Sequence, residues 1–116
     1  MGITRFIHNT GTTISTTEIS LINATSTIAT DTTDGAYSVI LDMGASVAGD
    51  FWQIAMYEKA HDSDAAVKEI IANIGGIIPG GKWESPTFTR GNGWDFTIKK
   101  ISGTDRSIGW SIWKWA

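Results

Sequence analysis

The sequence predicts an all-β protein: one antiparallel β-sandwich, of jelly-roll or immunoglobulin-like type, with about seven or eight strands. Three observations lead to this fold class. Segments that alternate apolar and polar side chains recur along the chain, and clusters of Gly, Asp and Asn separate them at a spacing of roughly 8 to 14 residues. A chain of 116 residues can also bury one hydrophobic core but not two. We therefore expect residues 14–116 to form a single domain.

The first third of the chain is rich in Thr, a β-branched residue that disfavours helices and suits extended backbone. Here Ile14–Ile22 predicts a first strand. Asp31–Gly35 predicts a turn, because Asp side chains hydrogen-bond to nearby backbone and Gly tolerates positive φ. Residues 1–13 have no obvious core role, so we expect an N-terminal arm that lies on a neighbouring subunit and is anchored by Phe6 and Ile7.

Two strands are expected in the middle of the chain, at Ala36–Met43 and Asp50–Lys59. Both carry apolar side chains on both faces, which is typical of central strands in a packed sheet. The following segment, Asp62–Gly75, is ambiguous because its apolar residues fit a helical spacing as well as a period of two. The surrounding β pattern favours a strand, with a helix as the alternative.

The C-terminal part predicts a loop and a hairpin. Gly75–Lys82 is Gly-rich and predicts the loop. Trp94–Lys99 shows the cleanest alternation of the whole chain, and Ser107–Trp115 follows it as the last strand. The short connection Ser102–Asp105 contains a glycine and predicts the turn between these two strands.

Six tryptophans are the main compositional excess of the chain. Three of them lie on predicted strands where they are expected to fill the core: Trp52, Trp94 and Trp110. Trp113 and Trp115 lie on the strand face opposite to Trp110, so they need cover from this chain or from another one. We expect five residues to form an interface with other protein chains: Phe6, Ile7, Trp83, Trp113 and Trp115.

The sequence offers little chemistry, and we expect no catalytic residue, cofactor or metal. Gly76–Lys82 has the glycine and lysine spacing of a phosphate-binding loop, but Trp83 stands where that loop needs Ser or Thr. His8 and His61 have no second ligand type at metal-site spacing, and no cysteine is present. A net charge of -3 argues against direct nucleic-acid binding, and no apolar run approaches the ~20 residues of a membrane span.

Six short stretches carry a likeness to a known group of proteins: Asp34–Val39, Gly49–Phe51, Met56–Lys59, Gly93–Lys100, Gly103–Ile108 and Trp110–Ile112. Together they resemble small virion proteins of tailed double-stranded DNA phages, and the C-terminal hairpin is the most specific part. The resemblance implies a β-sandwich decoration protein on the phage head, without a catalytic role. It also implies a strand over Val67–Ile74, whereas the Gly-rich Gly75–Lys82 departs from the group.

The resemblance leads us to expect a structural virion protein that is assembled in the host cytoplasm and stabilises the phage head. Its expected partners are the major capsid protein and further copies of itself, with a trimer as the implied oligomer. One alternative is a tail, connector or adsorption component. Another is a carbohydrate-binding β-module, in which exposed tryptophans stack against sugar rings. The open or covered state of Trp83, Trp113 and Trp115 distinguishes the last alternative from the others.

Overall fold

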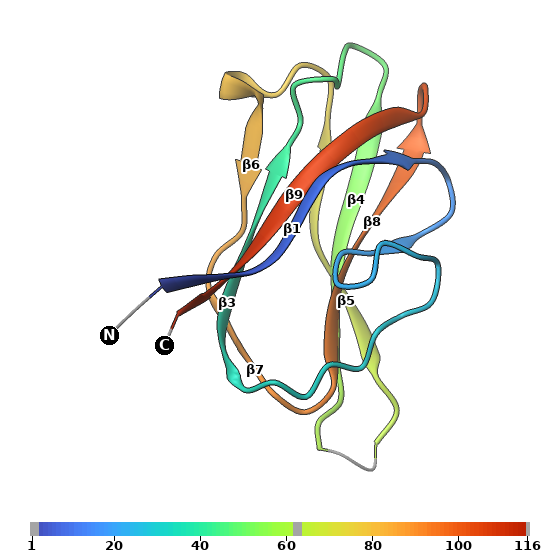
Figure 1. Cartoon of the computed structure of the whole chain (residues 1–116). Helices are drawn as coiled ribbons and strands as arrows, with labels where there is room; N and C mark the ends of the chain where they lie inside the picture. Colours follow the sequence, from blue (N-terminus) through green and yellow to red (C-terminus); the bar gives the residue numbers. More distant parts are fainter. Residues whose placement is uncertain (1–2, 62–63, 116) are drawn as a thin grey trace.

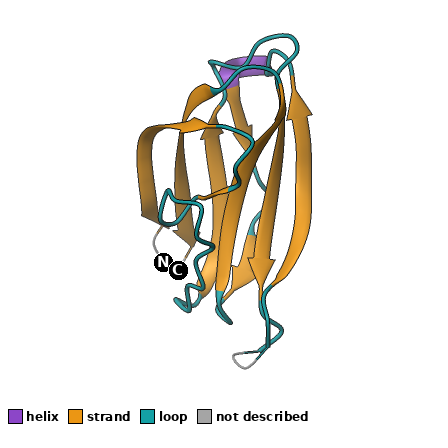
Figure 2. Cartoon of the chain, turned by 90° about the vertical axis from the view of Figure 1, so that its right-hand side faces the viewer, coloured by secondary structure: helices purple, strands orange, loops and turns teal. Residues whose placement is uncertain are grey.

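The computed structural model describes residues 3–61 and 64–115 and is an antiparallel β-sandwich (Figure 1). The fold class predicted from the sequence is therefore confirmed. Two sheets, called sheet A and sheet B below, pack face to face, as a view turned by a right angle makes clear (Figure 2). The described residues form nine strands, slightly more than expected.

Sheet A has five strands in the order β1-β9-β3-β6, and β7 also pairs with β3. Their bounds are β1 (Ile3–Ile14), β9 (Arg106–Trp115), β3 (Gly35–Asp42), β6 (Lys82–Glu84) and β7 (Phe88–Arg90). Sheet B has four strands in the order β2-β8-β4-β5. Their bounds are β2 (Ile19–Ser20), β8 (Trp94–Ser102), β4 (Phe51–Glu58) and β5 (Val67–Gly75). A short 3-10 turn, η1 (Pro79–Gly81), leads into β6.

The core lies between the sheets, where alternate side chains of the central strands meet. The three tryptophans predicted to fill it are at most 3% exposed: Trp52, Trp94 and Trp110. Each of their indole N–H groups donates a hydrogen bond, to Ser46 Oγ, Thr33 O and Leu21 O respectively. Large apolar surfaces are thus buried without leaving a polar nitrogen unpaired.

Residues 3–13 belong to strand β1 and not to an arm, which corrects the sequence-based prediction. β1 pairs with β9 of the same chain along its whole length. Phe6 packs edge-on against Tyr37 with 5.2 Å between ring centroids, and Ile7 also contacts the core. Residues 3–13 are therefore part of the β-sandwich domain, although they were expected to extend away from it as an arm.

Two bulges explain why β1 was missed. The register of β1 against β9 shifts between Arg5 and Ile7 and again between Asn9 and Thr12. Each bulge moves the following side chains to the other face of the sheet, so the period-two pattern that identifies a strand is lost. Residues 1–2, which the predicted arm also included, lie outside the described residues.

The predicted strand Ile14–Ile22 is interrupted. Ile14 ends β1, and β2 contains only Ile19 and Ser20. Between them, the Thr17 amide donates a hydrogen bond to Ser15 Oγ at 3.2 Å. Ser and Thr side chains that bond to nearby backbone compete with strand pairing in this way.

From Val67 onward the ambiguous segment before the Gly-rich loop is a strand, as predicted, whereas residues 64–66 lie outside the strand. β5 pairs antiparallel with β4 from Val67 to Gly75, with one register shift. Asp62 and Ser63, the first residues of the predicted segment, lie outside the described residues. Within the Gly-rich stretch itself, η1 and the start of β6 replace the expected featureless loop.

Candidate binding face of sheet A

The outer face of sheet A carries rows of side chains that run across its strands. On β9 the odd-numbered residues point outward, because Ile108, Trp110 and Ile112 fill the core. The rows follow from the strand pairing and are Ile3–Trp115–Ala36, Arg5–Trp113–Ser38, His8–Ser111–Ile40 and Gly109–Asp42–Lys82. From Gly109 to Trp115 this face extends over roughly 20 Å. We call it the outer face of sheet A.

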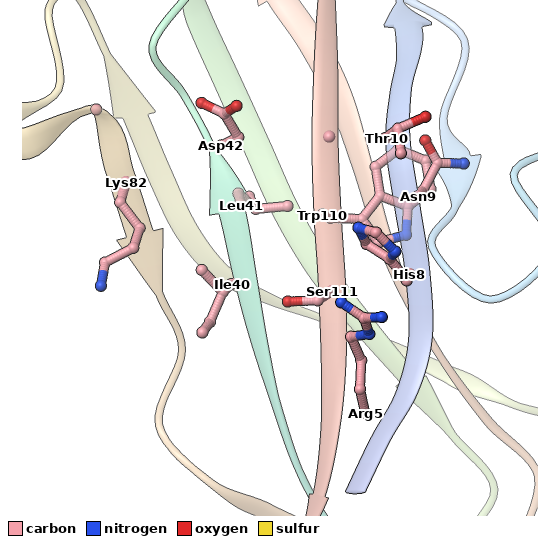
Figure 3. Close-up of a pocket in the computed structure, with 12 residues that line it drawn as sticks. Arg5, His8, Asn9, Thr10, Ile40, Leu41, Asp42, Lys82, Trp110 and Ser111 are labelled. Atoms are coloured by element: carbon pink, nitrogen blue, oxygen red, sulfur yellow. The ribbon is translucent and has the colours of Figure 1, made fainter.

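An open groove of about 510 Å³ lies at one end of this face (Figure 3). This groove, called the sheet A groove below, is formed by β1, β9, β3 and the beginning of β6. Its lining residues are Arg5, His8, Asn9, Thr10, Ile40, Leu41, Asp42, Gly81, Lys82, Gly109, Trp110 and Ser111. The volume falls within the roughly 300–1,000 Å³ that is typical of small-ligand sites.

Gly109 allows β1 to approach β9 closely beside the groove. A β-carbon at this position would lie 3.0 Å from Asn9 O and 3.1 Å from Thr10 O. The second bulge of β1 brings these carbonyl groups over Gly109, and Asn9 Oδ1 holds the bulge by accepting a hydrogen bond from the Gly11 amide at 2.9 Å. Because Gly109 has no side chain, the floor of the groove is low here.

Trp113 and Trp115 continue the outer face of sheet A beyond the groove. Trp113 is half-buried, and Trp115 is 40% exposed. The Trp113 indole N–H donates to Ser111 Oγ at 2.8 Å, and the Trp115 indole N–H donates to Ser38 Oγ at 3.2 Å. Both serines lie on the same face, so these hydrogen bonds fix the orientation of the two rings. Fixed aromatic rings beside a polar groove are suited to stacking against another ring.

The lining of the groove is cationic on two sides. The cations are Arg5 on the β1 side and Lys82 on the β6 side, and His8 also lines the β1 side (Figure 3). Asp42 is the one carboxylate that lines the groove within residues 3–61 and 64–115. Lys82 Nζ lies 2.7 Å from Glu84 Oε1, but both side chains are more than half exposed, so this ion pair is weak.

This arrangement is suited to binding. Most glycoside hydrolases use two carboxyl groups on opposite sides of the bond that breaks, and Asp42 is the one carboxylate among the described residues that line the groove. Within residues 3–61 and 64–115 there is no group of three or more side chains that could hold a metal ion. No helix in the same ranges has the length and apolar character needed to cross a membrane.

The structure separates the five residues predicted to form an interface. Phe6, Ile7 and Trp83 are partly buried and pack against the chain's own core. Trp83 lies opposite Leu41 on the inward side of sheet A, so it does not share a surface with Trp113 and Trp115. Trp113 and Trp115 do lie together on the outer face of sheet A.

The groove itself was missed in the sequence. Arg5, His8 and Thr10 belong to the segment that was taken for an arm, and their place beside β9 depends on the two bulges. Lys82 was assigned to a loop, although it pairs with Asp42. One feature of the sequence could have indicated the groove. Small residues alternate with the apolar side chains of Ser107–Trp115, which predicts that the outward face of this strand carries few large side chains.

A second surface lies on sheet B and is apolar. Four exposed side chains lie on its strands: Phe51 (51% exposed), Val67 (68%), Ile70 (50%) and Ile101 (49%). Phe51 and Ile101 border a hollow of about 430 Å³. The Phe51 ring covers Gly75, where a β-carbon would lie 2.2 Å from Phe51 Cδ1. We call Phe51 and Ile101, the two exposed side chains that border this hollow, the sheet B patch.

Comparisons with known proteins bear on the fold. No protein-family model and no curated protein sequence matches the chain. Among solved structures, the chain is similar to the N-terminal endo-1,4-β-D-xylanase 10B of Clostridium thermocellum, a structure of CBM22-1 and GH10 modules in complex with xylohexaose. The TM-score is 0.53 at 13% identity over 97% of this chain, which spans 28% of that protein. The chain thus shares a β-sandwich fold with a module of a xylanase.

Proposed function

We propose that this protein is a non-catalytic carbohydrate-binding module that holds a saccharide along the outer face of sheet A. The observation that carries the proposal is the placement of Trp113 and Trp115 in line with the sheet A groove on one sheet face. The β-sandwich shared with a module of a xylanase supports the same function.

The outer face of sheet A combines the two kinds of contact that a sugar needs. The faces of a sugar ring are apolar enough to stack on an aromatic side chain, and its hydroxyl groups need hydrogen-bonding partners. The ring contact comes from Trp113 and Trp115. The hydrogen bonds come from the groove, where Ser111, Thr10 and Asp42 offer polar groups.

A binding assay with replaced tryptophans tests this function. The purified protein is titrated with soluble polysaccharides and oligosaccharides, including xylohexaose, and binding is followed by calorimetry and tryptophan fluorescence. We expect Trp115→Ala to weaken binding roughly tenfold or more, as loss of a stacking tryptophan does in other interfaces. Trp113→Ala is expected to act in the same direction.

Phe51→Ala is the matched control, because Phe51 is an aromatic residue of similar exposure on sheet B. It should leave saccharide affinity unchanged. Thermal unfolding of each variant shows that the fold is retained. If no saccharide binds the wild-type protein, or if Phe51→Ala weakens binding as much as Trp115→Ala does, the proposed function is wrong.

The second candidate function is the structural role in a phage particle that the sequence resemblance implies. The sheet B patch favours it, because exposed apolar side chains that border one hollow are typical of protein–protein contacts. In this role the partners are the major capsid protein and further copies of the chain, and the location is the head or tail of the virion.

Mass spectrometry of purified particles, with copy-number quantification, tests the second candidate. The protein is expected in particles at a copy number that matches the capsid symmetry. Ile101→Asp should prevent its incorporation, whereas Ile77→Asp, which changes an exposed apolar side chain outside the patch (77% exposed), should not. Particles that lack the protein contradict the role.

A further inference from the structure

We infer that the saccharide held by the sheet A groove is acidic, with carboxylate groups such as those of uronic acid residues. This inference rests on the proposed function and adds the chemical class of the ligand. The observation behind it is the juxtaposition of Arg5 and Lys82 on opposite sides of one groove (Figure 3).

The positions of the two cations follow from the strand order. Arg5 comes from β1 at one edge of sheet A, and Lys82 comes from β6 at the other end of the strand order. Between them, β9 and β3 contribute the uncharged Ser111 and Ile40 to the floor. A ligand that lies across this floor meets a positive charge on each side.

Arg5 has no ion-pair partner within the described part of the chain, and its residue is exposed. The other two arginines behave differently. Arg90 pairs with Glu58 at 3.1 Å, and Arg106 pairs with Asp50 at 2.9 Å. The chain has 12 acidic and 9 basic residues, yet no carboxylate of the described residues pairs with the guanidinium beside the groove.

A carboxylate on the ligand would complete this arrangement. A planar guanidinium can donate two parallel hydrogen bonds to a carboxylate, and charged hydrogen bonds of this kind are about twice as strong as neutral ones. Lys82 offers a second cation, since its exposed pair with Glu84 is weak. Among the described residues that line the groove, Asp42 is the one that repels an anion, and its Oδ1 already accepts a hydrogen bond from the Gly44 amide at 3.1 Å.

The test compares acidic polymers with their neutral counterparts. Polygalacturonate, alginate and hyaluronate are each titrated into the 116-residue protein alongside the same polymer after chemical reduction of its carboxyl groups. We expect at least one acidic polymer to bind roughly tenfold more tightly than its reduced form at low salt. Added salt should narrow the difference, because it screens exposed charges.

Charge-removing variants locate the contact. Arg5→Gln and Lys82→Gln should each reduce the preference for the acidic polymer, measured as the ratio of its affinity to that of the reduced polymer, and the double variant should abolish this preference. Lys99→Gln is the control, because it removes the same charge from β8 of sheet B. An equal effect of Lys99→Gln, or equal binding of acidic and reduced polymers, overturns the inference and leaves the proposed function standing. Absence of binding to any saccharide overturns both.

Discussion

Asp95 is a carboxylate in an unusual place for a polar residue on a regular strand. It alternates with Trp94 and Phe96 on β8, so its side chain points to the outer face of sheet B, which would be exposed to solvent if no loop covered it. The segment before β3 covers it, and the Ala29 amide donates a hydrogen bond to Asp95 Oδ2 at 2.8 Å. Burial raises the pKa of Asp95 to about 6, although hydrogen bonds from Ser20 and Ala29 act in the opposite direction.

The raised pKa of Asp95 predicts how stability depends on pH. The folded protein holds the proton to a higher pH than the unfolded chain, whose pKa is near 3.8. The contribution of Asp95 to stability therefore falls as pH rises from about 4 to about 6, by roughly 2 to 3 kcal/mol in total. Asp95→Asn carries no titrating group, so the difference in unfolding free energy between wild type and Asp95→Asn should change by this amount over that range.

Urea unfolding of wild type and Asp95→Asn at a series of pH values measures this difference. Taking the difference between the two proteins cancels the pH-dependent contribution of other carboxylates, such as Glu18, to the unfolding free energy. Burial would raise the pKa of Glu18, but hydrogen bonds from Thr97, Tyr57 and Lys68 outweigh it and leave the pKa lowered. A difference that is constant from pH 4 to pH 7 would show that Asp95 is not protonated on folding.

At the scale of elements, Asp50 connects the loop before β4 to the β8–β9 hairpin. Its carboxylate accepts hydrogen bonds from the amides of Thr104 and Val47, each at 3.0 Å, and from Arg106 Nε at 2.9 Å. These three donors hold the pKa of Asp50 at about 2. Gly103 completes the contact, because a β-carbon there would lie 2.3 Å from Asp50 Oδ1.

Gly103→Ala is therefore predicted to disrupt this connection. Gly103 has a φ of 96°, a conformation that costs an L-residue about 1 to 2 kcal/mol, and the new methyl group would also displace Asp50. We expect Gly103→Ala to lower the unfolding free energy by about 3 kcal/mol. The measurement is chemical denaturation near neutral pH.

Gly49→Ala separates the two causes. Gly49 has nearly the same φ, 94°, but a β-carbon there would meet no atom within 4 Å. Gly49→Ala should therefore lower the unfolding free energy only by the cost of the backbone strain, about 1 to 2 kcal/mol. Equal losses for both variants would mean that the contact with Asp50 contributes nothing.

The strands that the sequence predicted well are those whose alternation of side chains depends only on which sheet face is packed against the core. β3, β4, β8 and β9 lie within a residue or two of the predicted segments, apart from the C-terminal end of β8, because they cross the core with regular alternation. β1 and β2 were mispredicted for local reasons, bulges in one and turn-forming hydroxyl groups in the other. The groove was hidden for the same reason, since it forms where bulged β1 meets Gly109.

At the scale of the whole molecule, the chain is held together by packing, because it contains no cysteine. β1 is important to this packing, although residues 1–13 were expected to lie on a neighbouring subunit as an arm. It covers one edge of β9 and contributes Phe6 to a cluster with Tyr37 and Trp94, whose rings lie 4.3 Å apart. Without β1, that edge of β9 and one side of the aromatic cluster would be open to water.

Deletion of residues 2–12 is thus predicted to prevent stable folding. The truncated chain should lose its cooperative thermal transition, as followed by near-ultraviolet circular dichroism and tryptophan fluorescence. Phe6→Leu is the milder companion variant, because it keeps the strand and most of the apolar volume, and it should fold with a stability loss of about 1 to 2 kcal/mol. If the truncated protein unfolds like wild type, the deleted residues are not needed for folding, and the original prediction of an N-terminal arm is correct.

The pairing of Ile3 with Trp115 has a practical consequence. The two outermost described residues are neighbours in sheet A, and both chain ends leave from the same corner of the molecule (Figure 1). A short Gly-Ser linker could therefore join the two ends of this 116-residue chain, and new ends could be opened between β3 and β4 at the exposed Ala48, which lies between the buried Ser46 and Asp50. Such a circular permutant would keep every strand and would move purification tags away from Trp115.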